Sequence, residues 1–202
     1  TLLNFCSSDL SSFYFDIRKD TIYCDSSNSK KRRSARTLLD ILFNYIVRWL
    51  APSLAFTCEE AWQSRGNTSS IHLEEFLKAE IGFKNDAIAR KWVLIKNIRK
   101  VITGALEIKR ADKIIGSSLE SHVDIYLSKE TKLKIENVDL AEISITSSVA
   151  LLDSEIPPLG FSINDIQGVV VDVKKAKGTK CNRCWKFDNK INTEGICKRC
   201  TD

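Results

Sequence analysis

The end of the chain carries two Cys-x-x-Cys pairs, Cys181 with Cys184 and Cys197 with Cys200. Each pair can place two sulfurs on one tight turn, and two such pairs complete the tetrahedron of ligands that a zinc ion accepts. Four sulfur ligands leave no position open for water or substrate, so the metal is expected to be structural. We therefore predict one Zn²⁺ here, with a rubredoxin-type iron site or two disulfides as the alternatives.

The segment around these cysteines has few other means of folding. Its large apolar residues are Trp185, Phe187, Ile191 and Ile196, too few to hold about twenty residues together without a staple. Metal binding, worth about 10–16 kcal/mol in zinc-finger peptides, becomes folding energy in such a segment. We expect the tail to fold only around its ion.

Composition narrows the class of protein. The chain has 202 residues, of which 43% are hydrophobic, enough for one large or two modest cores. It contains neither a run of eighteen apolar residues nor a secretory signal, so the cytoplasm is the default expectation. Cys6, Cys24 and Cys58 lie on apolar-periodic stretches and fit reduced, buried thiols. Methionine is absent even at position 1, which favours a piece of a longer polypeptide.

Positive charge is concentrated at the same end of the chain. The net charge is +5, and the segment from Lys174 to Cys200 holds nine Lys or Arg against Asp188 and Glu194. That segment is therefore +7 and the remainder −2; four thiolates with one Zn²⁺ would subtract two charges from the segment. Basic charge beside exposed aromatic rings suits a nucleic-acid backbone with a stacked base. A merely solvated tail is the alternative.

Helical periodicity dominates the first half. Apolar residues from Asp9 onward recur at helical spacing, and a second stripe runs over residues 30–50 until Pro52 ends or kinks that helix. Residues 57–60 have the pattern of a capping box that starts a short helix through Trp62. We expect the large apolar side chains of these helices to face a core. A long helix is predicted over residues 85–110.

The pattern changes after Gly116. Residues 117–120 are predicted to cap one turn, and the alternation from Val123 to Leu127 predicts a strand. Further strand segments are expected at 142–149 and 169–173, and 71–73 looks extended. His72 and His122 have no acid or thiol partner in the sequence, so both are expected to be structural. Pro157 and Pro158 indicate a loop.

These elements predict the organisation of the chain. We expect a mainly α-helical bundle at 1–111, a small α+β region at 112–176, and a four-cysteine zinc knuckle at 177–202. Nothing matches a phosphate-binding glycine loop or an acid–base cluster, so no catalytic residue is predicted.

Recognisable motifs run along the chain, from Leu3-Asn4-Phe5 at one end to Cys181-Asn182-Arg183-Cys184-Trp185 at the other. Through these motifs the sequence resembles bacterial-type isoleucyl-tRNA synthetases along essentially its whole length. The bundle motifs are shared with the valyl and leucyl relatives, whereas the terminal Cys-x-Arg-Cys-Trp motif singles out the isoleucyl family. The resemblance is carried by these stretches: Leu3-Asn4-Phe5, residues 9–24, Arg32-Arg33-Ser34-Ala35, Leu50-Ala51-Pro52, residues 56–62, residues 71–76, Ala105-Leu106-Glu107, residues 115–120 and residues 178–185.

The resemblance implies a class Ia anticodon-binding bundle, the tRNA-recognition part of the ligase that joins isoleucine to its tRNA with ATP. The family's His-Ile-Gly-His and Lys-Met-Ser-Lys-Ser signatures are missing from this chain, so adenylation, editing and ATP are expected to belong to N-terminal parts of the polypeptide. The implied partners are tRNA for isoleucine and those catalytic and editing parts, in a cytoplasmic monomer.

The resemblance also implies contacts with RNA. The knuckle arginine and tryptophan of the family meet the first anticodon base, and they match Arg183 and Trp185. Trp185 offers a stacking face and Arg183 a forked donor; alternatively, Trp185 forms the core of the knuckle. A zinc-knuckle DNA-binding module and a scaffold module remain alternative functions. The candidate phosphate contacts are Lys30, Lys31, Arg32, Arg33, Lys177 and Lys180.

Overall fold

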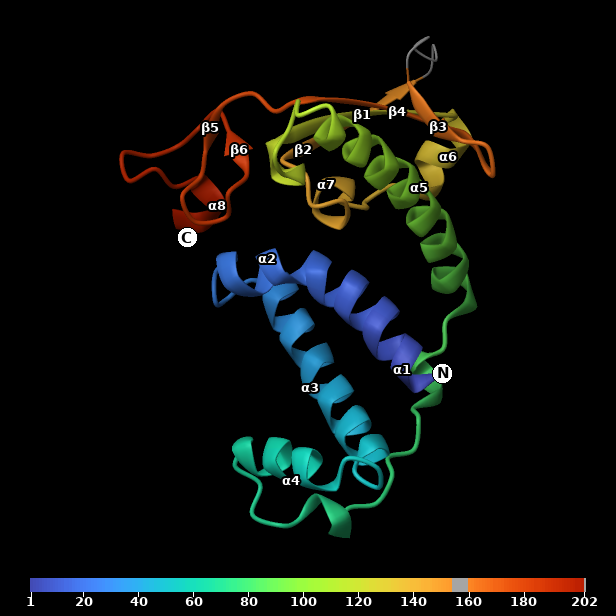
Figure 1. Cartoon of the computed structure of the whole chain (residues 1–202), viewed down its shortest axis with the longest axis vertical. Coiled ribbons are helices and arrows are strands. Elements are labelled where there is room, and N and C mark those ends of the chain that lie inside the picture. Colours follow the sequence, from blue (N-terminus) through green and yellow to red (C-terminus); the bar gives the residue numbers. More distant parts are fainter. Residues whose placement is uncertain (154–159, 202) are drawn as a thin grey trace. The chain divides into compact units, whose positions relative to one another are not determined.

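The computed structural model describes residues 1–153 and 160–201 (Figure 1). The chain forms two compact units, one made of Thr1–Ser26 with Asp86–Asp202 and the other of Ser27–Asn85. This division follows packing density, whereas the expected boundaries near 111 and 176 follow composition and function, so those boundaries stay a prediction. The predicted loop at Pro157 and Pro158 lies outside the described residues.

The unit of residues 27–85 is built on two helices. Helix α3 spans Lys30–Leu50 and begins at Ser29, whose hydroxyl accepts a hydrogen bond from the Arg32 amide at 3.3 Å. Helix α4 spans Ala55–Ser64, and two 3₁₀ turns follow, η2 at Ile71–Leu73 and η3 at Ile81–Phe83. Five buried side chains of this unit form a small core: Val47, Ala51, Cys58, Trp62 and Ile71.

Two local predictions in this unit are wrong. Helix α4 begins at Ala55 without a side-chain cap, because the amide of Leu54 already bonds to the Leu50 carbonyl and turns the chain before Thr57. The Glu59 carboxylate instead accepts from the Ser70 hydroxyl and the Ile71 amide, each at 2.9 Å. Those bonds help hold residues 71–73 as a 3₁₀ turn where an extended segment was expected.

The aromatic side chains of this unit only partly meet the expectation of burial. Trp62 is 5% exposed, and its indole nitrogen donates to the Ser69 carbonyl at 3.0 Å. Trp49 is 43% exposed and Phe56 is 92% exposed. Helical periodicity identified the helices but did not identify which apolar side chains a core would cover.

The other unit opens with one continuous helical run. It consists of α1 at Leu2–Asn4, the π-helix η1 at Phe5–Phe15 and α2 at Asp16–Cys24. The predicted helix therefore exists, but it starts earlier, and over η1 it is wider and underwound relative to an α-helix. Ser7 donates to the Leu3 carbonyl at 2.9 Å and Ser12 to the Ser7 carbonyl at 2.9 Å, and such serine bonds to the backbone disturb regular α-helix geometry.

A four-stranded sheet and a long helix form the main core of this unit. The strands are β1 (Ser121–Leu127), β2 (Ser148–Asp153), β3 (Phe161–Ile163) and β4 (Ile166–Lys175), in the order β2-β1-β4-β3. β1 pairs parallel with β2 and antiparallel with β4. Helix α5 spans Asp86–Ala111 as predicted and packs on the sheet (Figure 1).

Close packing of α5 on the sheet depends on a small residue. A methyl group on Gly104 would lie 2.8 Å from the ring of Phe161 in β3. The side chains of Ile98, Val101, Ile102, Val123 and Ile125 are fully buried between helix and sheet. Burial of this apolar surface is the main stabilising contribution to the unit.

Short elements complete the sheet region. The 3₁₀ turn η4 at Ser118–Glu120 is capped by Ser117, as the sequence predicts, and two short helices follow β1, α6 at Lys129–Lys134 and α7 at Leu140–Ile143. Part of the predicted strand 142–149 is thus wrong. The Asp139 carboxylate accepts from the Glu142 amide at 3.0 Å and starts α7, so the strand begins only at Ser148.

The C-terminal knuckle contains a hairpin of β5 (Thr179–Lys180) and β6 (Phe187–Asp188), followed by α8 at Lys198–Thr201. Among the described residues, no helix combines the length and the low polarity that crossing a lipid bilayer requires.

Candidate metal centre and adjoining cavity

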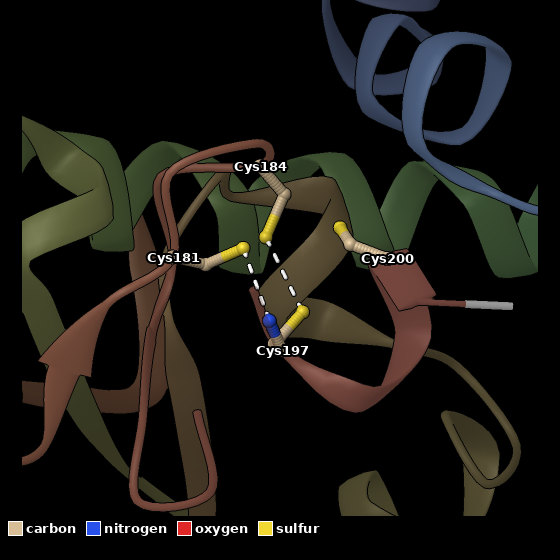
Figure 2. A group of neighbouring side chains, drawn as sticks. All are labelled: Cys181, Cys184, Cys197 and Cys200. Carbon is tan, nitrogen blue, oxygen red and sulfur yellow. Dashed lines mark hydrogen bonds between the residues drawn. The ribbon is translucent and has the colours of Figure 1, made fainter. Parts of the chain in front are cut away.

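The four predicted ligands converge on one point. The sulfur atoms of Cys181, Cys184, Cys197 and Cys200 all lie within 4.8 Å of one another, and all four residues are buried. Figure 2 shows the sulfurs pointing toward a shared centre. Cys184 Sγ and Cys197 Sγ are 3.7 Å apart, close to the roughly 3.8 Å edge of a tetrahedron with Zn–S bonds of about 2.3 Å. All seven cysteines are free thiols, so the disulfide alternative does not apply.

Backbone amides prepare part of this cluster for negative charge. Burial raises the pKa of Cys181, but amide bonds outweigh burial and lower that pKa to about 6; one of them comes from Cys197 at 3.3 Å. Burial raises the pKa of Cys184 and brings that of Cys200 to about 12. Collecting four buried sulfurs therefore favours a cation that replaces the thiol protons. The donor set fits a four-coordinate thiolate-preferring metal.

The hairpin that carries the first pair depends on a glycine. Gly178 has φ +100°, and a Cβ there would lie 2.5 Å from the Asp188 carbonyl oxygen on the opposite strand. The Cys181 amide then bonds to the Lys186 carbonyl at 2.9 Å, and the Trp185 amide to the Cys181 carbonyl at 2.9 Å. These bonds form the tight turn that presents both sulfurs on one side.

A bidentate ion pair holds the knuckle against helix α2. The Arg199 guanidinium donates to both carboxylate oxygens of Asp20, at 2.7 and 2.8 Å. Burial alone raises the pKa of Asp20, but Arg199 and Lys186 outweigh it and hold that pKa below its ordinary value. Because the folded pKa is lowered, the pair stabilises the fold at neutral pH and weakens only as pH falls below about 4.

Arg183 closes the same interface. Its guanidinium donates to the Cys200 carbonyl at 3.0 Å and to the Tyr23 carbonyl at 3.2 Å. The Cys24 thiol contacts the Arg183 carbonyl at 3.9 Å and packs against the four-cysteine cluster. Burial raises the pKa of Cys24 to about 11, so this thiol stays protonated. Arg183 thus links the two turns of the knuckle to the end of α2.

Trp185 lies outside the core of the knuckle. Its side chain is 59% exposed, and the Lys180 ammonium lies 5.4 Å from the centre of its ring. The residue directly follows Cys184 and adopts φ +65°, a left-handed conformation that is unusual for a bulky side chain. The alternative that Trp185 forms the core of the knuckle is therefore wrong.

A cavity of about 350 Å³ adjoins the metal centre. Helix α2 forms one wall, the segment around Glu142 and Ile145 forms a second, and residues 183–186 of the knuckle form a third. The Glu142 carboxylate accepts from Arg18 and from Thr21, each at 2.8 Å. These bonds tie α7 to α2 and fix the width of the cavity.

Two strained backbone positions line this cavity. Two of its lining residues, Ile145 with φ +56° and Trp185 with φ +65°, have left-handed backbones, which are outliers for β-branched and bulky residues. The neighbouring hydroxyls of Ser144 and Thr146 are buried without a hydrogen-bond partner among the described residues. Strained and unsatisfied groups cluster at functional sites in proteins, which makes this cavity a candidate site.

The predicted phosphate-contact residues lie in two places. Lys30, Lys31, Arg32 and Arg33 form the first turn of α3, in the unit of residues 27–85. Lys177 and Lys180 are exposed beside and within the β5 strand. Only Lys177 and Lys180 therefore share a unit with the metal centre.

His122 has an acid partner that the sequence analysis missed. Its Nε2 lies 3.0 Å from Asp124 Oδ1, and its Nδ1 lies 2.7 Å from Ser148 Oγ. Residues two apart on a strand share a face, and this spacing was the available signal. Burial raises the pKa of Asp124, but Lys174 and His122 outweigh it and lower that pKa. His72 is exposed, and its amide donates to the Ser70 hydroxyl.

Sequence reasoning also missed Asp20, Cys24 and Glu142 as parts of the site. Asp20 and Arg199 are 179 positions apart, and no local pattern connects them.

Comparison with known proteins gives a family for residues 1–126 and relatives that align with nearly the whole chain. Residues 1–126 match the family described as the anticodon-binding domain of tRNA ligase. The chain is 44% identical over 195 residues to the isoleucine–tRNA ligase of Bartonella henselae and 43% identical over 195 residues to that of Agrobacterium fabrum. It is 45% identical over 197 residues to the ligase of Bradyrhizobium diazoefficiens.

Each of these alignments covers 96% of the chain and 20% of the relative. The chain thus spans about a fifth of the length of the curated relatives it matches. Since the family match extends over 126 of the 202 residues, the chain belongs to the family of anticodon-binding domains of tRNA ligases.

Proposed function

We propose that this chain recognises the anticodon of the tRNA for isoleucine, as the C-terminal segment of an isoleucine–tRNA ligase. The observation that carries the proposal is Trp185, an exposed indole on a strained backbone, placed at the rim of a cavity by the preceding cysteine. Anticodon bases are single-stranded and can be splayed out and stacked on aromatic rings. The family that residues 1–126 match is described as an anticodon-binding domain.

The cavity explains how one base would be held. Stacking on Trp185 contributes about 1–3 kcal/mol per base and tolerates different bases. Arg183 uses part of its five N–H donors on the carbonyls of Cys200 and Tyr23. Its remaining donors can reach a base edge or a phosphate. Arg183 then combines two roles, because it positions the knuckle and contacts the anticodon.

The four cysteines would hold one structural Zn²⁺, which supplies tetrahedral cross-linking and no reaction chemistry. In this proposal the zinc knuckle is residues 177–202, the small α+β region is residues 112–176, and the class Ia anticodon-binding bundle is residues 1–111. The knuckle fixes the angle at which Arg183 and Trp185 face the RNA.

Cations at the start of α3 support a contact with the RNA backbone. Lys30, Lys31, Arg32 and Arg33 occupy the first helical turn, where the helix dipole disfavours positive charge. A phosphate group would relieve that repulsion, since helix N-termini attract anions. Lys177 and Lys180 would supply further phosphate contacts near the knuckle.

The proposal assigns ATP-dependent activation of isoleucine, and editing, to parts of the ligase outside this chain. The chain contributes binding of tRNA and no catalytic residue. The working setting is a cytoplasmic monomer in which the anticodon segment and the catalytic segment engage one tRNA.

Substitution of Trp185 tests the proposal. For the zinc-loaded Trp185→Ala variant, we expect affinity for the isoleucine anticodon stem–loop to fall about 5- to 150-fold, the equivalent of about 1–3 kcal/mol of stacking. Fluorescence anisotropy with labelled RNA measures the affinity, and metal analysis shows whether the knuckle is intact. Trp185→Phe keeps an aromatic face and is expected to lose less affinity.

Comparing the affinities of the chain for different nucleic acids distinguishes the proposed function from its two alternatives. Preference for the isoleucine anticodon over the same stem–loop with an altered anticodon supports the proposal. Equal binding of duplex DNA would favour a DNA-binding module, and weak binding of all nucleic acids would favour a scaffold. Equal affinity of Trp185→Ala and the unmodified chain, with metal retained, would contradict the role of the indole.

A further inference from the structure

A second cavity, of about 270 Å³, lies between η1 and α5. It is separate from the metal centre, and no residue is shared between the linings of the two cavities. Its lining combines cations, hydroxyls and one aromatic ring, and within the described residues it includes no carboxylate. The lining residues are Ser8, Phe13, Lys96, Arg99, Lys100 and Thr103.

The cations of this cavity come from one face of α5. Lys96, Arg99, Lys100 and Thr103 stand at i, i+3, i+4 and i+7, which places them on one side of a helix. Like charges at this spacing repel one another. These three cations nevertheless all line the same cavity.

Contacts outside the cavity hold two of the cations in place. Arg99 donates from Nε to the Ile143 carbonyl at 2.9 Å, and its guanidinium lies 3.9 Å from the Asp16 carboxylate. Lys96 lies 3.1 Å from Asp9. Lys100 has no ion-pair partner among the described residues, so its ammonium is available to a ligand. Burial lowers the pKa of Arg99, and a bound anion would oppose that change.

The η1 side of the cavity is also unusual. Lys96 and Arg99 lie 4.9 and 5.3 Å from the centre of the Phe13 ring, a cation–π arrangement that fixes both head groups. Phe13 and Ser8 belong to a π-helix of 11 residues. π-helical geometry is rare in proteins as a whole, and where it occurs it is frequently at a functional site.

We infer that this cavity binds a phosphate group, and that the phosphate belongs to the backbone of the RNA whose anticodon base enters the first cavity. The RNA assignment rests on the proposed function. Asp16 connects the two places, because it lines the first cavity and its carboxylate approaches Arg99 of the second. About one helical turn separates Phe13 from Ile17, and the two residues line the second and first cavities respectively.

Neutralising Lys100 tests this site. Lys100 is exposed, so Lys100→Gln is expected to fold normally. Affinity for the isoleucine anticodon stem–loop is measured with the zinc-loaded chain at a series of KCl concentrations. We expect the slope of log K against log salt to become shallower by about 0.7, the value for one lost phosphate contact on a single strand. Lys109→Gln, the same change elsewhere on α5, should leave the slope unchanged, and Lys100→Arg should retain it.

Titration with inorganic phosphate distinguishes a phosphate of the RNA backbone from free phosphate as the ligand of this cavity. Its binding is followed by NMR shifts of the Arg99 and Lys100 side chains. A shallower slope for Lys100→Gln supports an RNA phosphate. An unchanged slope with saturable shifts overturns the RNA assignment and leaves a site for free phosphate, and an unchanged slope without shifts overturns the site. Absence of any stem–loop binding by the unmodified chain would instead defeat the proposed function, and the phosphate titration would still decide the cavity.

Discussion

The sheet region and the knuckle lie in one unit but are held together differently. Between α5 and the sheet, side chains such as Ile98 and Val123 have no exposed surface. The core of the knuckle consists of cysteines, with Ile191 and Ile196 only partly buried against them. Apolar burial stabilises the first region whether or not a metal ion is present. Under the proposed function, the second region folds around a bound cation, so removal of that cation should unfold the knuckle and leave the sheet region folded.

Removal of the metal should have the largest effect. We expect a strong chelator to unfold residues 179–201, because zinc binding contributes about 10–16 kcal/mol in comparable peptides. The α5–sheet core should remain folded. Hydrogen exchange measures this: amides of the knuckle lose protection, and those of β1 and β4 keep it.

Cys197→Ser should reproduce the effect of the chelator. Cys6→Ser is the matched control, since Cys6 lies outside the knuckle. Protection of the knuckle amides in metal-free protein would contradict the comparison.

Truncating a side chain in the apolar core should destabilise the α5–sheet region and leave metal binding by the knuckle unchanged. Ile98→Ala is expected to lower the free energy of unfolding by about 2–5 kcal/mol, because the site is fully buried. Chemical denaturation followed by circular dichroism measures the change. Ile108→Ala, at a position 46% exposed on the same helix, should cost far less. Metal stoichiometry below that of the unmodified protein in folded Ile98→Ala would show that the regions are not independent.

Breaking the contact between knuckle and α2 should have the smallest effect. Asp20→Asn removes the charge that Arg199 pairs with and is expected to cost about 1–2 kcal/mol at neutral pH, a modest value because both side chains are partly solvated. The metal should stay bound, while hydrogen exchange at the end of α2 should increase. A double-mutant cycle with Arg199→Gln, which removes the positive charge, separates this pair from other effects; a coupling energy of zero would sink the assignment.

Sequence patterns predicted the elements with strong periodicity or strong chemistry. The long helix α5 and the strands β1 and β4 follow from apolar spacing. The four-cysteine cluster follows from ligand spacing. In each case the signal is contained in a short stretch of chain.

The wrong predictions share one physical cause. Thr57 resembles a helix cap, but the turn at Leu50–Leu54 starts the helix earlier. Residues 71–73 resemble a strand, but the Glu59 carboxylate bonds across twelve positions and bends them. The Asp20–Arg199 pair and both cavities likewise depend on side chains brought together by folding, which local patterns do not encode.

The direct sequence neighbours Cys184 and Trp185 couple two binding events. Any RNA that stacks on Trp185 in its present conformation stabilises the turn that presents the Cys184 sulfur. Thermodynamic linkage is reciprocal, so RNA must strengthen metal binding by the same factor by which the metal strengthens RNA binding. Under the proposed function, the knuckle would therefore release zinc least readily while tRNA is bound, and zinc shortage would empty this site first in chains that hold no tRNA.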